Sequence, residues 1–137
     1  MSNNQLVGLP TSIQRLTKLE RLDLSGNKLT ELPAQIGDLR ELRKLRVNKN
    51  LLVGLPTSIQ RLTKLRWLHL DRNKLTELPA EIGDLRELWA LSVGRNPLTV
   101  NAIRRALNLR KKGVIVDGVA GKHSGYCSYL EVRKKPR

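Results

Sequence analysis

The chain has 137 residues, the length of one domain, and its 26 Lys and Arg against 12 Asp and Glu give a formal charge of +14. This balance favours acidic partners or polyanions but does not bear on the fold. Phe is absent and aromatic residues make up 3% of the chain, so the core must be aliphatic. Cys127 is the single cysteine, which excludes an internal disulfide, and no apolar run approaches the length of a membrane span. We therefore expect a cytoplasmic protein with no membrane-bound segment.

The chain begins with a short polar stretch and half of a repeating unit, over residues 1–18. Residues 6–18 read LVGLPTSIQRLTK, and residues 7–18 return unchanged at 53–64. Because a terminal repeat must cover the end of the core, either the polar residues 1–5 suffice or the repeats extend further upstream. An open end predicts either a monomer or a weak end-to-end dimer.

A pattern with a period of 23 residues runs through residues 19–98. The unit LERLDLSGNKLTELPAQIGDLRE begins at Leu19, and related units begin at Leu42, Leu65 and Leu88. A fixed period of this size indicates a solenoid. Each unit contains one short alternating apolar stretch, which predicts a strand that is parallel to its neighbours. The predicted strands are centred on residues 22–24, 45–47, 68–70 and 91–93.

The segments between the predicted strands carry fixed columns of Asn, Pro and Ile. We expect the Asn after each strand to bond backbone groups where the chain leaves the sheet. The Pro that follows each Leu suits the first position of a short helical turn. An Ile and a Leu three residues apart in each turn are expected on one buried face. The pairs are Ile13 and Leu16, Ile36 and Leu39, Ile59 and Leu62, and Ile82 and Leu85.

Residues 99–119 depart from the repeat and predict a C-terminal cap made of a helix and a strand. Residues 99–109 have a helical pattern, with Thr99 or Asn101 as the N-cap and Gly113 beyond the end. One face of this helix is expected to pack on the repeats, and it consists of Ile103, Ala106, Leu107 and Leu109.

A fifth strand is predicted at residues 114–116. Val114 follows Leu91 by 23 residues, and Val116 follows Val93 by the same interval. We therefore expect Val114 beside Leu91 and Val116 beside Val93, both on the core side of the sheet.

The unit begins L-x-x-L-x-L-x-x-N-x-L, which resembles the leucine-rich repeat. Its continuation L-P-x-x-I-G-x-L is similar to the 23-residue intracellular type of bacterial, plant and Ras-pathway repeat proteins. The resemblance covers residues 6–98. It implies an α/β fold, a solenoid with a short curved parallel sheet and a convex side of helical and irregular segments. It also implies a protein that recognises a protein ligand and is not an enzyme.

A second period of 46 residues separates fixed positions from varied ones. Residues 5–50 and 51–96 differ at 12 of their 46 aligned positions, and two of these differences are Gln5/Leu51 and Gln35/Glu81. The other ten are the five x positions of L-x-x-L-x-L-x-x-N in both pairs of repeats. We interpret this as diversification of one binding face, similar in strategy to variable lymphocyte receptors. Selection for new ligands, recombination among repeat cassettes and deliberate randomisation would each produce this pattern.

We predict that the varied positions line the concave face of the sheet and contact the ligand. Trp and Arg are enriched in binding hot spots, and both Trp of the chain occupy varied positions. With parallel strands ~4.8 Å apart, Arg46 is expected beside His69, and Trp67 between Lys44 and Ala90. The predicted ligand-binding residues are Arg21, Asp23, Arg43, Lys44, Arg46, Asn48, Arg66, Trp67, His69, Asp71, Trp89 and Ser92.

Catalytic and metal-binding interpretations have little support in the sequence. His69, Asp71 and Ser92 could form a base and a nucleophile, but all three lie in varied positions, so we expect no catalytic residue. His123 and Cys127, in the basic tail of residues 120–137, fall short of the four ligands of a structural zinc site. No motif in the chain indicates a cofactor.

The expected partner is a protein with an acidic surface, and two alternatives remain open. The chain could be part of an intracellular signalling adaptor with a longer repeat array. It could also bind a polyanion such as nucleic acid, because Trp beside Arg can stack bases. Glu20, Asp23 and Asp71 would oppose phosphate groups, which makes nucleic acid the weaker alternative.

Overall fold

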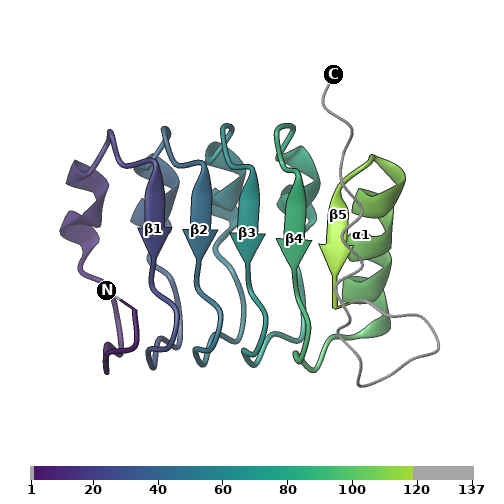
Figure 1. Ribbon diagram of the computed structural model, residues 1–137, viewed down its shortest axis with the longest axis horizontal. Helices are drawn as coiled ribbons and strands as arrows, with labels where there is room; N and C mark the ends of the chain where they lie inside the picture. The colour runs from purple at the N-terminus through teal and green to yellow at the C-terminus, as the bar shows by residue number, and fades with distance from the viewer. Residues whose placement is uncertain (1, 119–137) are drawn as a thin grey trace.

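Five short parallel strands form one sheet in chain order, which confirms the predicted leucine-rich repeat type of solenoid (Figure 1). The computed structural model describes residues 2–118. The strands are β1 (Arg21–Asp23), β2 (Lys44–Arg46), β3 (Trp67–His69), β4 (Ala90–Ser92) and β5 (Ile115–Asp117). From β1 to β4 each residue pairs with the residue 23 positions later, as the period predicts. The basic tail, with His123 and Cys127, lies outside the described residues.

Four 3-10 turns of five residues cover the other face of the sheet (Figure 1). They are η1 (Thr11–Arg15), η2 (Ala34–Asp38), η3 (Thr57–Arg61) and η4 (Ala80–Asp84). The Pro before each turn is its N-cap residue and has an extended backbone, one position earlier than predicted. The reason is visible in η1, where the Pro10 carbonyl accepts the first bond of the turn, from the N–H of Ile13 at 3.1 Å.

Aliphatic side chains fill the space between the sheet and the turns. A Leu from each of β1 to β4, Val116 from β5 and an Ile from every turn are buried, and burial of each such side chain contributes about 1.5–3 kcal/mol. The predicted buried face of the turns is confirmed except at Leu16, which is 47% exposed. In the described structure η1 has a neighbouring turn on one side only, so nothing covers the outer side of Leu16.

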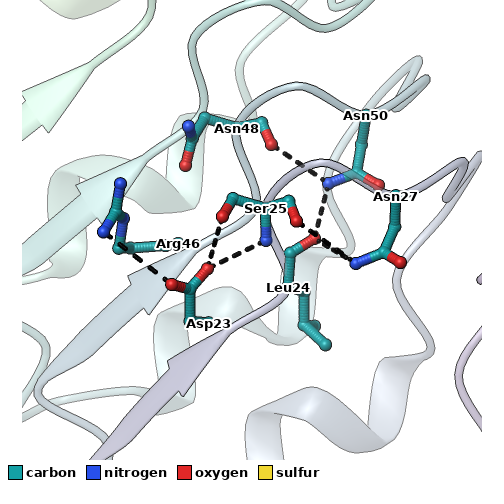
Figure 2. Close-up of polar contacts among 7 residues, drawn as sticks. All are labelled: Asp23, Leu24, Ser25, Asn27, Arg46, Asn48 and Asn50. Carbon is teal, nitrogen blue, oxygen red and sulfur yellow. Dashed lines mark hydrogen bonds and ion pairs between the residues drawn. The ribbon is translucent and has the colours of Figure 1, made fainter. Parts of the chain in front are cut away.

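The Asn column bonds backbone groups where the chain leaves the sheet, as predicted, and these bonds also join neighbouring repeats. The Asn50 Nδ2 donates to the carbonyl oxygens of Leu24 at 2.9 Å and Val47 at 3.0 Å, and its Oδ1 accepts from the Leu29 N–H at 3.0 Å. Figure 2 shows the bond to Leu24. Asn73 makes the equivalent bonds one repeat further along. Each Asn therefore supplies buried backbone groups with partners that the short strands do not provide.

The C-terminal helix α1 (Val100–Lys111) replaces the 3-10 turn of the last unit. Thr99 is its N-cap and accepts a bond from the Ala102 N–H at 3.2 Å, and Gly113 follows the helix with φ 87°. Leu107 is 37% exposed, so its predicted place on the repeats is wrong. With 3.6 residues per turn, residues 102, 106 and 109 share the buried face, and Leu107 lies about 100° from Ala106.

Strand β5 pairs with β4 two residues away from the predicted register. Val116 lies beside Leu91, and Ile115 lies beside Ala90. The segment that contains α1 is longer than a repeat with a 3-10 turn, so the interval between paired residues becomes 25. Because the shift is an even number of residues, the alternation of faces is preserved. Val114 and Val116 are therefore buried on the core side, as predicted.

Candidate binding surface

Side chains on the sheet face opposite the turns form two rows that cross the strands. In each of β1 to β4 the middle residue is buried, and its two neighbours lie on the open face. The first row consists of Arg21, Lys44, Trp67, Ala90 and Ile115. The second row consists of Asp23, Arg46, His69, Ser92 and Asp117. The predicted neighbours of Arg46 and Trp67 are confirmed.

Trp67 and Trp89 pack against each other on this face. Their ring centroids are 5.4 Å apart and their planes meet at 73°, the edge-to-face geometry that aromatic rings prefer. The guanidinium carbon of Arg66 lies 5.3 Å from the Trp89 ring centroid, within the range of cation–π attraction. These three residues form what we call the Trp cluster, at the beginning of β3 and β4. Both indoles are half-buried, so the cluster is held in place and still faces solvent.

Three ion pairs join cations of the varied positions to carboxylates. Arg43 lies 3.4 Å from Glu20, Arg46 lies 3.7 Å from Asp23, and Arg66 lies 3.9 Å from a carboxylate of Glu87. All are partly exposed, so each contributes about 0–1 kcal/mol. Their effect is chiefly to orient the guanidinium groups. Within the described residues Lys44 and Arg21 have no ion pair, which leaves the beginning of the first row positively charged.

A polar network lies at the end of β1 (Figure 2). The Ser25 hydroxyl donates to Asp23 Oδ1 at 2.6 Å, and the Ser25 N–H donates to the same oxygen at 3.0 Å. Burial acts to raise the pKa of Asp23, but these two bonds and the charge of Arg46 together hold that pKa below its ordinary value. Asp23 is therefore a stable carboxylate that turns the Arg46 guanidinium toward β1.

His69 occupies the middle of the second row and is half-buried. Burial, then the charges of Arg46 and Lys44, lower its pKa, and the carboxylates of Asp71 and Asp23 only partly oppose this. The neutral imidazole is therefore favoured. The Ser92 hydroxyl donates to Asp71 Oδ1 at 3.0 Å instead of to the imidazole. His69, Asp71 and Ser92 do not form the nucleophile–base pair that catalysis would require.

The fourth x position of the motif is more buried than predicted in three of the four repeats, and Asp71 is the partly exposed exception. Asn48 is 7% exposed, and Ser25 and Gly94 in the same column are also buried. The chain turns away from the sheet after the second row, so this column packs against its neighbours in adjacent repeats. Asn48 therefore does not belong to the open face, although its side-chain oxygen has no hydrogen-bond partner in the described structure.

Comparison with known proteins identifies the family. The leucine rich repeat model matches residues 1–52 and 40–98, most of the chain. The chain belongs to the leucine-rich repeat family. A leucine-rich repeat protein of Leptospira interrogans has a TM-score of 0.80 and 39% identity, over 84% of this chain and 29% of that one. The leucine-rich repeat ectodomain of the receptor kinase SOBIR1 from Arabidopsis thaliana has a TM-score of 0.65 and 32% identity, over 72% of this chain and 56% of that one.

A curated relative is similar over a shorter segment. The leucine-rich repeat and calponin homology domain-containing protein of Drosophila melanogaster is 47% identical over 51 residues. The aligned segment spans 36% of this chain and 6% of the Drosophila protein. The match thus spans only a small part of that protein's length.

Leucine-rich repeat domains generally mediate protein–protein recognition and are generally non-catalytic. Among residues 2–118 no three His, Cys, Asp or Glu side chains are grouped so as to hold a metal ion. No helix in that part of the chain is both long and apolar enough to cross a membrane.

Sequence reasoning missed three features of this leucine-rich repeat surface. Ile115 is the neighbour of Ala90 in the first row, because the register of β5 differs from the predicted one, but it is buried, with 7% of its surface exposed. Glu87 pairs with Arg66, although it lies in a constant position outside the strand motif. The fifth x position has a left-handed backbone in every repeat, and the glycine at position 26 was the signal in the sequence.

Proposed function

We propose that this leucine-rich repeat protein recognises a protein ligand through the concave face of its sheet and catalyses no reaction. One observation carries the proposal: the positions that differ between the duplicated units flank the buried middle residue of each strand, and the Trp cluster stands among them. The side chains on either side of the middle residue lie on the open face, so packing of the aliphatic core does not constrain them. Rigid aromatic residues beside Arg are the residue types that dominate binding energies.

The charges on this face support a ligand with both acidic and apolar groups. Arg21 and Lys44 begin the first row without a carboxylate partner among the described residues, and Trp67 and Ala90 continue it. A ligand that crosses the strands would therefore meet cations first and apolar side chains afterwards. The carboxylates of Glu20 and Asp23 on the same face disfavour a phosphate backbone, which makes nucleic acid the weaker candidate.

The cellular setting is part of the same proposal. With a single cysteine the chain cannot form an internal disulfide, which fits a reducing compartment such as the cytoplasm. We propose a monomeric form, with its ligand held on the open sheet face.

The proposal is tested by comparing the partners captured by the wild type with those captured by single variants. Trp67→Ala removes the middle residue of the first row and Arg46→Ala removes the cation of the second row, while Gln60→Ala alters an exposed residue of η3 as a control. Truncation of a hot-spot side chain costs about 2 kcal/mol or more of binding free energy, so Trp67→Ala should lower the affinity for a ligand of this face at least about thirtyfold. Gln60→Ala should bind as the wild type does. If Trp67→Ala and Arg46→Ala retain the same partners, the concave site is wrong.

A further inference from the structure

A second surface lies along the edge of the sheet where the strands end, away from the Trp cluster. The turns that follow β1 to β4 lie side by side along this edge (Figure 1). In each turn the residue before the repeat Asn has a left-handed backbone, with φ between 55° and 68°. These residues are Gly26, Lys49, Arg72 and Arg95.

The three cationic residues at this edge adopt a strained backbone conformation. A left-handed backbone is unfavourable for any residue with a Cβ, and glycine adopts it freely. Gly26 in the first repeat shows that glycine fits the turn. Lys49, Arg72 and Arg95 instead place long charged side chains at positions where glycine would relax the backbone. Strained residues cluster at functional sites, so these three side chains are candidates for a binding role.

Two further observations show that these cations are available to a ligand. Lys49, Arg72 and Arg95 are exposed and have no carboxylate within ion-pair distance in the described structure, whereas three cations of the concave face are paired. Leu51, two residues after Lys49 in the chain, is an apolar side chain that is 39% exposed. Leu51 replaces Gln5 of the first unit, one of only two changes outside the strand motif.

We propose that the edge strip, defined as Lys49, Leu51, Arg72 and Arg95, docks an acidic amphipathic helix that lies across the strands. Adjacent strands are ~4.8 Å apart, so the three cations recur at about that interval. Helix residues three or four apart have Cβ atoms ~5–6 Å apart, so Asp or Glu at i, i+3 and i+7 stays level with successive cations.

An extended peptide fits the edge strip less well. Its same-side residues are ~6.6 Å apart and would fall out of step with the cations. Leu51 supplies an apolar contact for the adjoining row of the helix. A phosphate backbone would gain nothing from an apolar side chain at this place. Trp67 lies at the opposite end of β3 from Arg72, so a helix on the edge strip leaves the Trp cluster open. This surface therefore stands independently of the proposed concave site.

The test uses a variant in which removal of the charges should weaken binding while relief of the backbone strain should raise the stability of the fold. Lys49→Gly, Arg72→Gly and Arg95→Gly together remove the three cations and relax the three turns. The control variant, Arg15→Ala, Lys18→Ala and Arg104→Ala, makes the same charge change at exposed residues elsewhere.

Two labelled peptides of equal composition serve as probes. One is a helical peptide with Glu at i, i+3 and i+7 and Leu in the adjoining row, and the other has its Glu residues in one block. We expect the wild type to prefer the spaced peptide. Loss of three exposed ion pairs corresponds to about tenfold weaker binding, so the triple glycine variant should lose about that factor while its Tm rises. The control variant and Trp67→Ala should bind the spaced peptide as the wild type does.

Several outcomes would overturn the inference. Equal binding of the two peptides, or an equal loss in the control variant, would mean that only net charge matters. Tighter binding of a single-stranded oligonucleotide than of the spaced peptide would assign the strip to nucleic acid. A lower Tm of the triple glycine variant would contradict the strain argument. Weaker binding of the spaced peptide by Trp67→Ala would show that the two surfaces are one. If only the proposed concave site is wrong, the wild type still binds the spaced peptide and the triple glycine variant still binds it more weakly.

Discussion

Replacement of Asn50 by Ala tests how the repeats are held together. Its Oδ1 accepts from the Leu29 N–H, which would be left buried without a partner, at a cost of about 1–3 kcal/mol. The carbonyls of Leu24 and Val47 each lose one bond but keep another, from Asn27 and Asn73 respectively. Each lost bond costs about 0.5–1.5 kcal/mol. Together these terms give about 4 kcal/mol, a large fraction of the 5–15 kcal/mol that stabilises a typical domain.

The free energy of unfolding is measured by urea titration, followed by circular dichroism. Asn108→Ala is the matched control, because Asn108 is exposed on α1 and Ala favours helix. It should change stability by less than about 0.5 kcal/mol. A loss below about 1 kcal/mol in Asn50→Ala, with an unchanged denaturant slope, would refute the reasoning. So would equal losses in the two variants.

Two other predictions concern packing and pH. Gly37→Ala should lower the free energy of unfolding by about 1–3 kcal/mol, because an added Cβ would lie 2.6 Å from the Ser58 carbonyl oxygen. In the control Gly83→Ala the added Cβ meets nothing closer than 3.6 Å, so this variant should be nearly neutral. Equal melting temperatures for the two variants would contradict this. The folded protein holds the pKa of His69 below its ordinary value of 6.5. As the pH falls through 6.5, the unfolded chain therefore takes up a proton before the folded protein does. The free energy of unfolding decreases until the pH reaches the pKa of His69 in the folded protein. A proton NMR titration should place the pKa of His69 below 6.5 and move it upward in Arg46→Met, and a value above 6.5 in the wild type would exclude this account.

The candidate site was largely predictable because it repeats. Alternation within each strand and a constant interval of 23 residues suffice to place Trp67 between Lys44 and Ala90, and Arg46 beside His69. What the period cannot supply is the end of each strand. The strands are only three residues long, so the fourth x position, with Asn48, already turns into the packing between repeats.

The sequence by itself determined which residues occupy equivalent places in successive repeats, because every repeat of one length adopts the same local backbone. Only the tertiary structure decided what lies beside each of those places. Leu16 is exposed although its equivalents are buried, and Gly37 is tightly packed although its equivalent Gly83 is not. Likewise, β5 shifts its register because α1 lengthens the segment before it. Periodicity describes a residue's own repeat, whereas burial and contact depend on which neighbour covers it.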